Sequence, residues 1–131
     1  MSFSNIYFIL HKPQLSENIG ACARALKNFN FRNLILINAK VSYPNDKVLA
    51  TSVGAKDVIK KSKTFEKLEP ALKKIDYLIA TTSRFRNKNI KHINIKDLSK
   101  IDFNKNIGFL FGSEASGLSN EEISYANCVL Q

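Results

Sequence analysis

Four short runs of apolar residues stand out along the chain, at residues 6–10, 34–37, 77–80 and 107–111. Each run is nearly continuous rather than alternating, which is the pattern of strands that are buried on both faces of a sheet. A further run, at residues 128–130, has the pattern of a strand that is just beginning. We therefore expect the four runs to form the core of a parallel sheet.

The spacing of apolar residues between the first two runs predicts an amphipathic helix. Its expected buried stripe consists of Ile19, Cys22, Leu26 and Phe29. Ser16 or Asn18 is available to cap the helix, because serine and asparagine side chains accept hydrogen bonds from the free amides of a first turn. The first two strands and this helix would form one strand–helix–strand unit.

Two further segments, residues 48–62 and 66–74, are predicted to be helical between the second and third strands. Gly54 marks a break in the first segment, and Pro70 is compatible only with the first turn of a helix in the second. Residues 84–100 are the least periodic part of the chain and the most basic. We expect them to form a long surface loop.

After the fourth run, Ser119 and Glu122 have the spacing of a capping box and predict a helix over residues 120–126. The alternation of strands and helices predicts an open, mainly parallel α/β sheet with flanking helices. Ligands of such sheets bind beyond the carboxyl ends of the strands. With 131 residues, the chain fits a single domain spanning residues 1–131.

The charge of the chain adds a candidate partner. Twenty basic residues against eleven acidic ones give a net charge of +9, which favours a polyanion, with nucleic acid ahead of an acidic membrane. A biased genome composition would produce the same excess of lysine. The charge therefore supports a nucleic-acid partner without establishing one.

The two cysteines, Cys22 and Cys128, lie far apart in the sequence and match no metal-ligand spacing. We expect two free, buried thiols and no metal. The first residues contain no basic leader, and no apolar run approaches the roughly 18 residues of a membrane span. These features predict a cytoplasmic protein that does not enter the membrane.

The third and fourth strands both end in small residues, at 80–86 and 111–119. Gly112 and Gly117 would let the backbone turn tightly and approach a flat ring, while Glu114 could accept hydrogen bonds from ribose hydroxyls or an amine. Either loop alone is equally well explained as an ordinary turn. Because both loops follow the carboxyl ends of strands, together they favour a ligand site.

Two groups of basic residues are candidates for phosphate contact. The first lies on the predicted helix, where Gly20, Arg24 and Asn28 share a face and Lys27 lies beside them. This face is either a solvated basic surface or a phosphate site for the planar guanidinium of Arg24. The second group consists of Arg84, Arg86, Lys88 and Lys91. We expect the second group on the same side of the sheet as the two small-residue loops.

Several familiar motifs are absent from the sequence, including GxGxxG, the Walker loop, HExxH, paired CxxC and a serine elbow. Glu121 and Glu122 are explained by helix capping, so no carboxylate pair indicates hydrolysis. His11 and His92 receive no role.

Three stretches in order, at residues 17–29, 80–86 and 109–122, resemble the TrmH/TrmJ branch of the SPOUT RNA 2'-O-methyltransferases, and particularly the TrmJ-like tRNA enzymes. The first family motif places asparagine and arginine on the opening helix, matched by Asn18 and Arg24. The second motif is matched by Phe111, Gly112, Glu114, Gly117 and Leu118. Three ordered matches are more specific than one.

The resemblance implies an α/β fold with a trefoil knot, a homodimer, and S-adenosylmethionine held in the knot loops. The implied cofactor contacts are Thr81, Thr82 and Ser83 after one strand, and Gly112, Ser113, Glu114, Gly117 and Leu118 after the next. The implied catalytic residues are Arg24 and Asn18. The implied RNA-binding residues are Arg24, Lys27, Arg84, Arg86, Lys88 and Lys91. Because guanidinium stays protonated, we expect Arg24 to anchor phosphate and orient the reaction.

The family's third motif, a loop with serine and asparagine followed by a closing helix, has no counterpart in residues 1–131. The resemblance therefore implies that the knot-closing segment is absent or incomplete here. The leading functional hypothesis is methyl transfer to a ribose 2'-hydroxyl of transfer RNA. Ribosomal RNA is the alternative substrate, and a non-catalytic RNA-binding domain is the alternative class of function.

Overall fold

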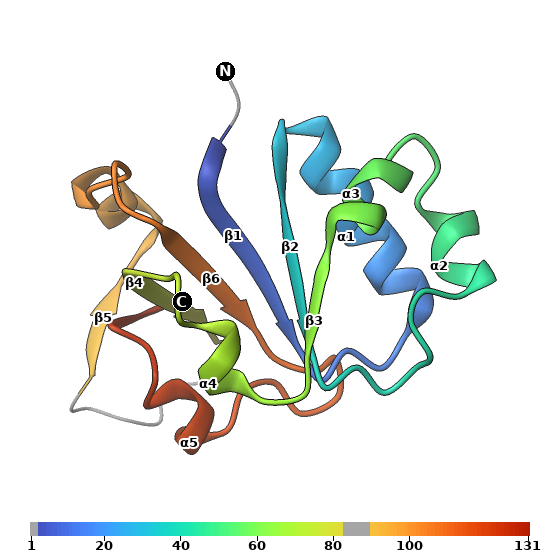
Figure 1. Cartoon of the computed structure of the whole chain (residues 1–131). Helices are drawn as coiled ribbons and strands as arrows, with labels where there is room; N and C mark the ends of the chain where they lie inside the picture. Colours follow the sequence, from blue (N-terminus) through green and yellow to red (C-terminus); the bar gives the residue numbers. More distant parts are fainter. Residues whose placement is uncertain (1–2, 83–89) are drawn as a thin grey trace.

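The computed structural model describes residues 3–82 and 90–131, which form a seven-stranded sheet with parallel neighbours throughout (Figure 1). The strands are β1 (Phe3–His11), β2 (Phe31–Ile37), β3 (Lys63–Phe65), β4 (Tyr77–Thr81), β5 (Lys91–Ile93), β6 (Ile107–Phe111) and β7 (Cys128–Leu130). Their order across the sheet is β3-β2-β1-β6-β4-β7-β5. The predicted open α/β sheet is confirmed.

Helices flank both faces of this sheet. They are α1 (Ser16–Asn28), α2 (Asp46–Thr51), α3 (Lys56–Lys61), α4 (Leu68–Ala71), α5 (Asn120–Ile123) and the 3₁₀ helix η1 (Ile95–Lys100). Helices α1, α2 and α3 gather on one face, whereas α4 and α5 lie on the other (Figure 1). The sheet is therefore the middle of three layers.

Alternate residues of β2 face opposite layers. Leu34 and Leu36 pack with residues of α1, α2 and α3, whereas Ile35 and Ile37 pack with residues of α4 and α5. All four side chains are buried. Residues 34–37 of β2 are apolar at every position because both faces of this part of the strand are covered, and this explains the continuous apolar runs of the sequence.

The two edge strands, β3 and β5, were not predicted. Each contains only three residues, and neither has a continuous apolar run. The prediction of a surface loop over residues 84–100 is wrong for residues 91–100, which form β5 and η1. Residues 83–89 lie outside the described part of the chain.

Helix α1 buries Ile19 and Leu26 of the predicted stripe but not Cys22 and Phe29. Its buried residues are Ser16, Ile19, Gly20, Ala23 and Leu26. Phe29 is 70% exposed because the helix ends before it, and Cys22 is only half-buried. Leu15 occupies the N-cap position without a side-chain hydrogen bond. The prediction of Ser16 or Asn18 as the cap is therefore wrong.

Gly20 is buried in the contact between α1 and α2, whereas Arg24 and Asn28, which were predicted to share its face, are exposed. A Cβ atom at this position would lie 1.9 Å from Thr51 Oγ1 and 2.9 Å from the carbonyl carbon of Thr51. The Thr51 hydroxyl is itself held, because it donates a hydrogen bond to the Lys47 carbonyl oxygen at 2.8 Å. Glycine is required here by the close approach of two helices.

The remaining helices are shorter than predicted. Residues 48–62 contain the end of α2 and all of α3, separated at Gly54, whose φ of +78° confirms the predicted break. Pro70 lies in the single turn of α4, which agrees with its first-turn restriction. Helix α5 begins with the predicted capping box but ends at Ile123, earlier than expected.

Both cysteines are free, as predicted, although only Cys128 is fully buried. Within the described ranges, no helix has the length and apolar character needed to cross a membrane.

We predict that Gly20→Ala lowers the free energy of unfolding by about 1–3 kcal/mol, because the added methyl group overpacks against Thr51. In an uncrowded helix the same change stabilises by up to about 1 kcal/mol through helix propensity. Urea denaturation followed by circular dichroism measures the difference. Ala25→Gly, at an exposed position of α1, is the propensity control. A Gly20→Ala protein at least as stable as the wild type would contradict the predicted overpacking.

Candidate functional site

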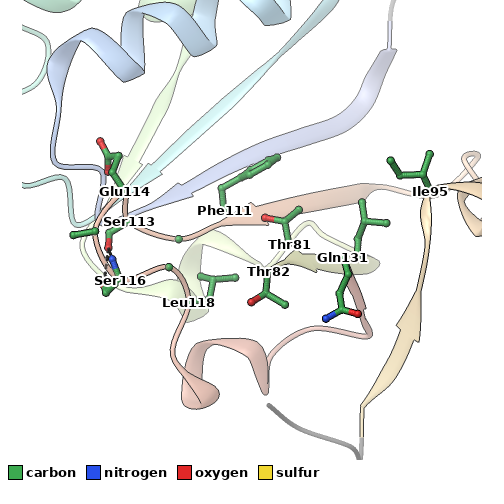
Figure 2. A pocket seen from close by; sticks show the side chains of 13 residues that line it. Thr81, Thr82, Ile95, Phe111, Ser113, Glu114, Ser116, Leu118 and Gln131 are labelled. Atoms are coloured by element: carbon green, nitrogen blue, oxygen red, sulfur yellow. Dashed lines mark hydrogen bonds between the residues drawn. The ribbon is translucent and has the colours of Figure 1, made fainter. Parts of the chain in front are cut away.

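A cavity of about 620 Å³ opens at the carboxyl ends of β4, β6 and β7 (Figure 2). It is lined by Thr81, Thr82, Ile95, Phe111, Gly112, Ser113, Glu114, Ala115, Ser116, Gly117, Leu118, Leu130 and Gln131. This edge is where open parallel sheets bind their ligands, and the volume lies within the usual range of roughly 300–1,000 Å³ for small-molecule sites. The cavity is therefore the candidate binding site.

The cavity brings together every described residue for which cofactor contact was predicted. These residues are Thr81, Thr82, Gly112, Ser113, Glu114, Gly117 and Leu118. Ser83 lies outside the described residues. Ile95, Leu130 and Gln131 were not predicted, because their presence here depends on β7 pairing between β4 and β5.

The loop after β6, residues 112–118, closes on itself and is named the β6 loop below. The Gly117 N–H donates to the Ser113 carbonyl oxygen at 2.9 Å, and the hydroxyls of Ser113 and Ser116 are 2.7 Å apart. A Cβ atom at Gly112 would lie only 2.2 Å from the carbonyl carbon of Gly117. Gly117 has a φ of +66°, a region that favours glycine. Both glycines therefore shape the loop.

The Glu114 carboxylate turns from the cavity towards the segment before α1 (Figure 2). Its Oε1 accepts a hydrogen bond from the Gln14 N–H at 3.0 Å. Its Oε2 accepts from the Leu15 N–H at 2.9 Å and from Asn18 Nδ2 at 3.2 Å. A negative charge is favourable here, because the amino end of a helix carries free amides and the positive end of the helix dipole. The Leu15 side chain cannot accept these hydrogen bonds, and Glu114 accepts them in its place.

Burial raises the pKa of the Glu114 carboxyl group, but the hydrogen bonds from Gln14, Leu15 and Asn18 outweigh it, so the pKa lies below its ordinary value. The group is therefore ionised at neutral pH. Its hydrogen bonds go to α1, and the predicted contact of Glu114 with ribose or an amine stays a prediction. In the described part of the chain, no group of three or more His, Cys, Asp or Glu side chains could hold a metal ion.

Comparison with known proteins identifies the family, because residues 5–131 match the SpoU rRNA Methylase family. The chain belongs to this family. The tRNA (cytidine-2'-O-)-methyltransferase TrmJ of Methanocaldococcus jannaschii is 34% identical over 90% of this chain and 53% of its own length. Escherichia coli LasT, described as an uncharacterized tRNA/rRNA methyltransferase, is 34% identical over 93% of this chain and 55% of its own.

A solved structure supports the same assignment. TrmJ from Z. mobilis ZM4 has a TM-score of 0.88 at 28% identity, covering 95% of this chain and 57% of that one. The predicted SPOUT resemblance is therefore confirmed. The SpoU-family chain spans about half the length of the curated relatives it matches. The expected absence or incompleteness of the knot-closing segment and the homodimer stay predictions.

The two residues of the first SpoU-family motif do not lie side by side. Six positions along an α-helix place two side chains about 120° apart around the axis and about 9 Å apart along it. Asn18 faces the Glu114 carboxylate, whereas Arg24 is exposed on a different side of α1. Asn18 therefore belongs to the anchor of the β6 loop, and Arg24 is presented to solvent.

The other described basic candidates lie in two different places. Lys27 Nζ lies 2.6 Å from Asp57 Oδ2, so this lysine already has an acidic neighbour. Lys91 begins β5 and lines a second cavity with Tyr77 and Ile107, the first residues of β4 and β6. The expectation that it shares a side with the small-residue loops is therefore wrong. Arg84, Arg86 and Lys88 lie outside the described residues.

We predict that Glu114→Gln lowers the free energy of unfolding at pH 7 and flattens its pH dependence. The folded-state pKa of Glu114 lies below its ordinary value of 4.5, so its charge stabilises the fold above the unfolded pKa. This contribution is lost as the pH falls through the folded pKa. Urea unfolding between about pH 6 and about pH 3 compares both proteins.

Glu66→Gln, at an exposed position, removes the same charge away from α1 and is the matched control. If wild type and Glu114→Gln lose stability in parallel over this pH range, the ionised Glu114 does not stabilise the start of α1.

Proposed function

We propose that this chain forms the body of an S-adenosylmethionine-dependent methyltransferase that acts on a ribose 2'-hydroxyl of transfer RNA. The main support for this proposal is that the ends of β4, β6 and β7 line the same cavity. Family membership supports the reaction class. The similarity to a tRNA (cytidine-2'-O-)-methyltransferase, 34% identical, supports the substrate class.

The residues of the cavity fit the proposed cofactor. S-adenosylmethionine combines a flat adenine ring with a polar ribose and a charged amino acid part. The cavity combines the apolar side chains of Phe111, Leu118 and Leu130 with the polar groups of Ser113 and Gln131. Several of these side chains surround the same hollow in Figure 2. Small-molecule sites typically pair apolar walls with a few polar groups in this way.

When bound, S-adenosylmethionine would supply an activated methyl group. The chain's own contribution is to hold the reacting groups in line, which can account for much of an enzymatic acceleration. Thr81 Oγ1 donates to the Leu110 carbonyl oxygen at 3.0 Å, which ties the end of β4 to β6. The β6 loop on one side and this tie on the other would fix the cofactor's position.

Arg24 is the residue we propose to act on the RNA. Its guanidinium remains protonated and presents a planar set of donors that matches a phosphate group. Its exposure on α1, apart from the Glu114 anchor, suits contact with a large substrate. Asn18 would support catalysis indirectly, by holding Glu114. A net charge of +9 favours the same polyanionic substrate.

We also propose a homodimer and a cytoplasmic location. The dimer follows from the family resemblance, and the location follows from a transfer RNA substrate.

Calorimetric titration of S-adenosylmethionine into the chain tests the cofactor proposal. We predict saturable binding, which Gly112→Ala weakens by at least about tenfold because its Cβ would displace the Gly117 backbone. Gly54→Ala is the control, since a Cβ atom at Gly54 would meet no atom within 4 Å and Gly54 lies outside the cavity. Absence of binding to the wild-type chain, with RNA binding retained, would instead support a non-catalytic RNA-binding domain.

We predict that Arg24→Ala lowers methyl transfer to transfer RNA on the order of 100-fold, because the ribose is no longer held in line. Its affinity for S-adenosylmethionine should stay within about twofold of wild type, since Arg24 does not line the cavity. Radiolabelled methyl transfer and calorimetry measure the two quantities. Arg32→Ala, another exposed arginine, is the control. Equal loss of cofactor affinity would remove the proposed role of Arg24.

The family description names ribosomal RNA, which makes it the second candidate substrate. The same transfer assay with purified ribosomal RNA and transfer RNA separates the two. Faster transfer to ribosomal RNA would overturn the transfer RNA proposal while leaving the reaction class intact.

A further inference from the structure

The β6 loop is tied to the connection between β1 and α1 at two places. Glu114 within the loop binds the start of α1, as described above. Glu122, just beyond the loop on α5, reaches back to His11 and Lys12 at the end of β1. The first tie is part of the family motif, whereas His11 received no role from the sequence.

The second tie is a buried polar contact. Glu122 Oε2 lies 3.2 Å from His11 Nδ1 and 3.9 Å from Lys12 Nζ, and its Oε1 accepts a hydrogen bond from the Ser119 N–H at 2.8 Å. The side chains of His11 and Glu122 are only 9% and 15% exposed. Removing one partner of a buried polar pair is costly, because the other loses its hydrogen bond without regaining water.

The chain near Lys12 is itself held firmly. Lys12 has a φ of +55°, and its N–H donates to the Ile37 carbonyl oxygen at 2.7 Å, which fixes the end of β1 against β2. The His11 side of the contact is therefore part of the rigid sheet. Glu122, which the capping box ties to Ser119, links this fixed point to the end of the β6 loop.

Behind the β6 loop lies a cavity of about 300 Å³ that His11, Lys12 and Glu122 help to line. Ser113, Ser116, Gly117 and Leu118 line both this cavity and the 620 Å³ cavity. The loop is thus a thin wall between two spaces. Leu118 is packed into the core, whereas Ser116 and Gly117 are exposed, and interiors are rigid only where atoms interdigitate.

We propose that His11 and Glu122 are positioning residues that hold the β6 loop in the conformation that binds S-adenosylmethionine. This inference rests on the proposed function. Neither residue lines the larger cavity, so each acts through the loop. Removing the contact lets Ser116 and Gly117 shift towards the smaller cavity, while Leu118 stays packed in the core.

The protonation state of His11 agrees with this role. Burial lowers the pKa of His11, Glu122 on α5 opposes this effect, and the nearby Lys12 and Lys40 lower the pKa further. The imidazole is therefore neutral at neutral pH and carries one N–H. When Nδ1 donates this N–H to the Glu122 carboxylate, the imidazole is held in the tautomer that is protonated on Nδ1.

Hydrogen–deuterium exchange of residues 112–119, measured by mass spectrometry without cofactor, tests the proposal. We expect His11→Leu to accelerate exchange there about tenfold, the effect of losing one hydrogen bond to a charged group. His11→Asn should restore near-wild-type exchange, because its side-chain amide nitrogen can take the place of Nδ1. Val48→Ala, buried in α2, is the control for general destabilisation.

Glu122→Asp provides a second variant if His11→Leu does not fold. Aspartate can still cap the helix, as Asp97 does in the capping box of η1, but its shorter side chain withdraws from His11. We expect the same acceleration over residues 112–119. Unchanged exchange in Glu122→Asp, or no rescue by His11→Asn, overturns the proposal.

Calorimetry with S-adenosylmethionine separates this inference from the proposed function. If the wild type binds the cofactor, Glu122→Asp and His11→Leu should weaken binding about tenfold, and unchanged affinity overturns the positioning role. If the wild type does not bind, the proposed function fails and the proposal that the pair holds a cofactor-binding loop fails with it. The exchange data then still show whether the pair orders the loop.

Discussion

The Glu114 carboxylate at the start of α1 is the interaction on which the candidate site depends. The first helix begins at a residue that offers no capping side chain, so its free amides need an acceptor from elsewhere. Glu114, about 100 positions later in the sequence, provides that acceptor. One ion–dipole contact therefore satisfies the helix and fixes the β6 loop. The two family motifs that carry Asn18 and Glu114 are a single physical unit.

The central strands were predictable because burial on both faces leaves a mark in the local sequence, a run of apolar residues. A strand segment that is covered on both faces is apolar at nearly every position, as residues 6–10, 34–37, 77–80 and 107–111 are within β1, β2, β4 and β6. The Ser119–Glu122 cap and the break at Gly54 were predictable for the same reason, since each needs only neighbouring residues. The short edge strands β3 and β5 carry no such pattern, because much of their surface is exposed.

The candidate site was predictable only in part. The loops after β4 and β6 could be recognised from small residues at the ends of strands, and they do share a cavity. Gly20 gave no local sign that a second helix packs against it, and Phe29 fits the helical spacing although the helix ends before it. The contribution of Gln131 and the separation of Lys91 from the cavity both depend on strand order. Strand order is a long-range property that spacing along the chain does not encode.

Because β6 lies between β1 and β4, it also determines when the two halves of the sheet can pair during synthesis. Strands β1, β2 and β3 pair with one another and lie within the first half of the chain. By contrast, β4 has no earlier strand as a neighbour, because both of its partners, β6 and β7, follow it. During synthesis, an apolar strand must therefore remain unpaired until about 30 further residues have been made. The nascent chain is most exposed to misassembly in that interval, between two halves of a sheet that only β6 can join.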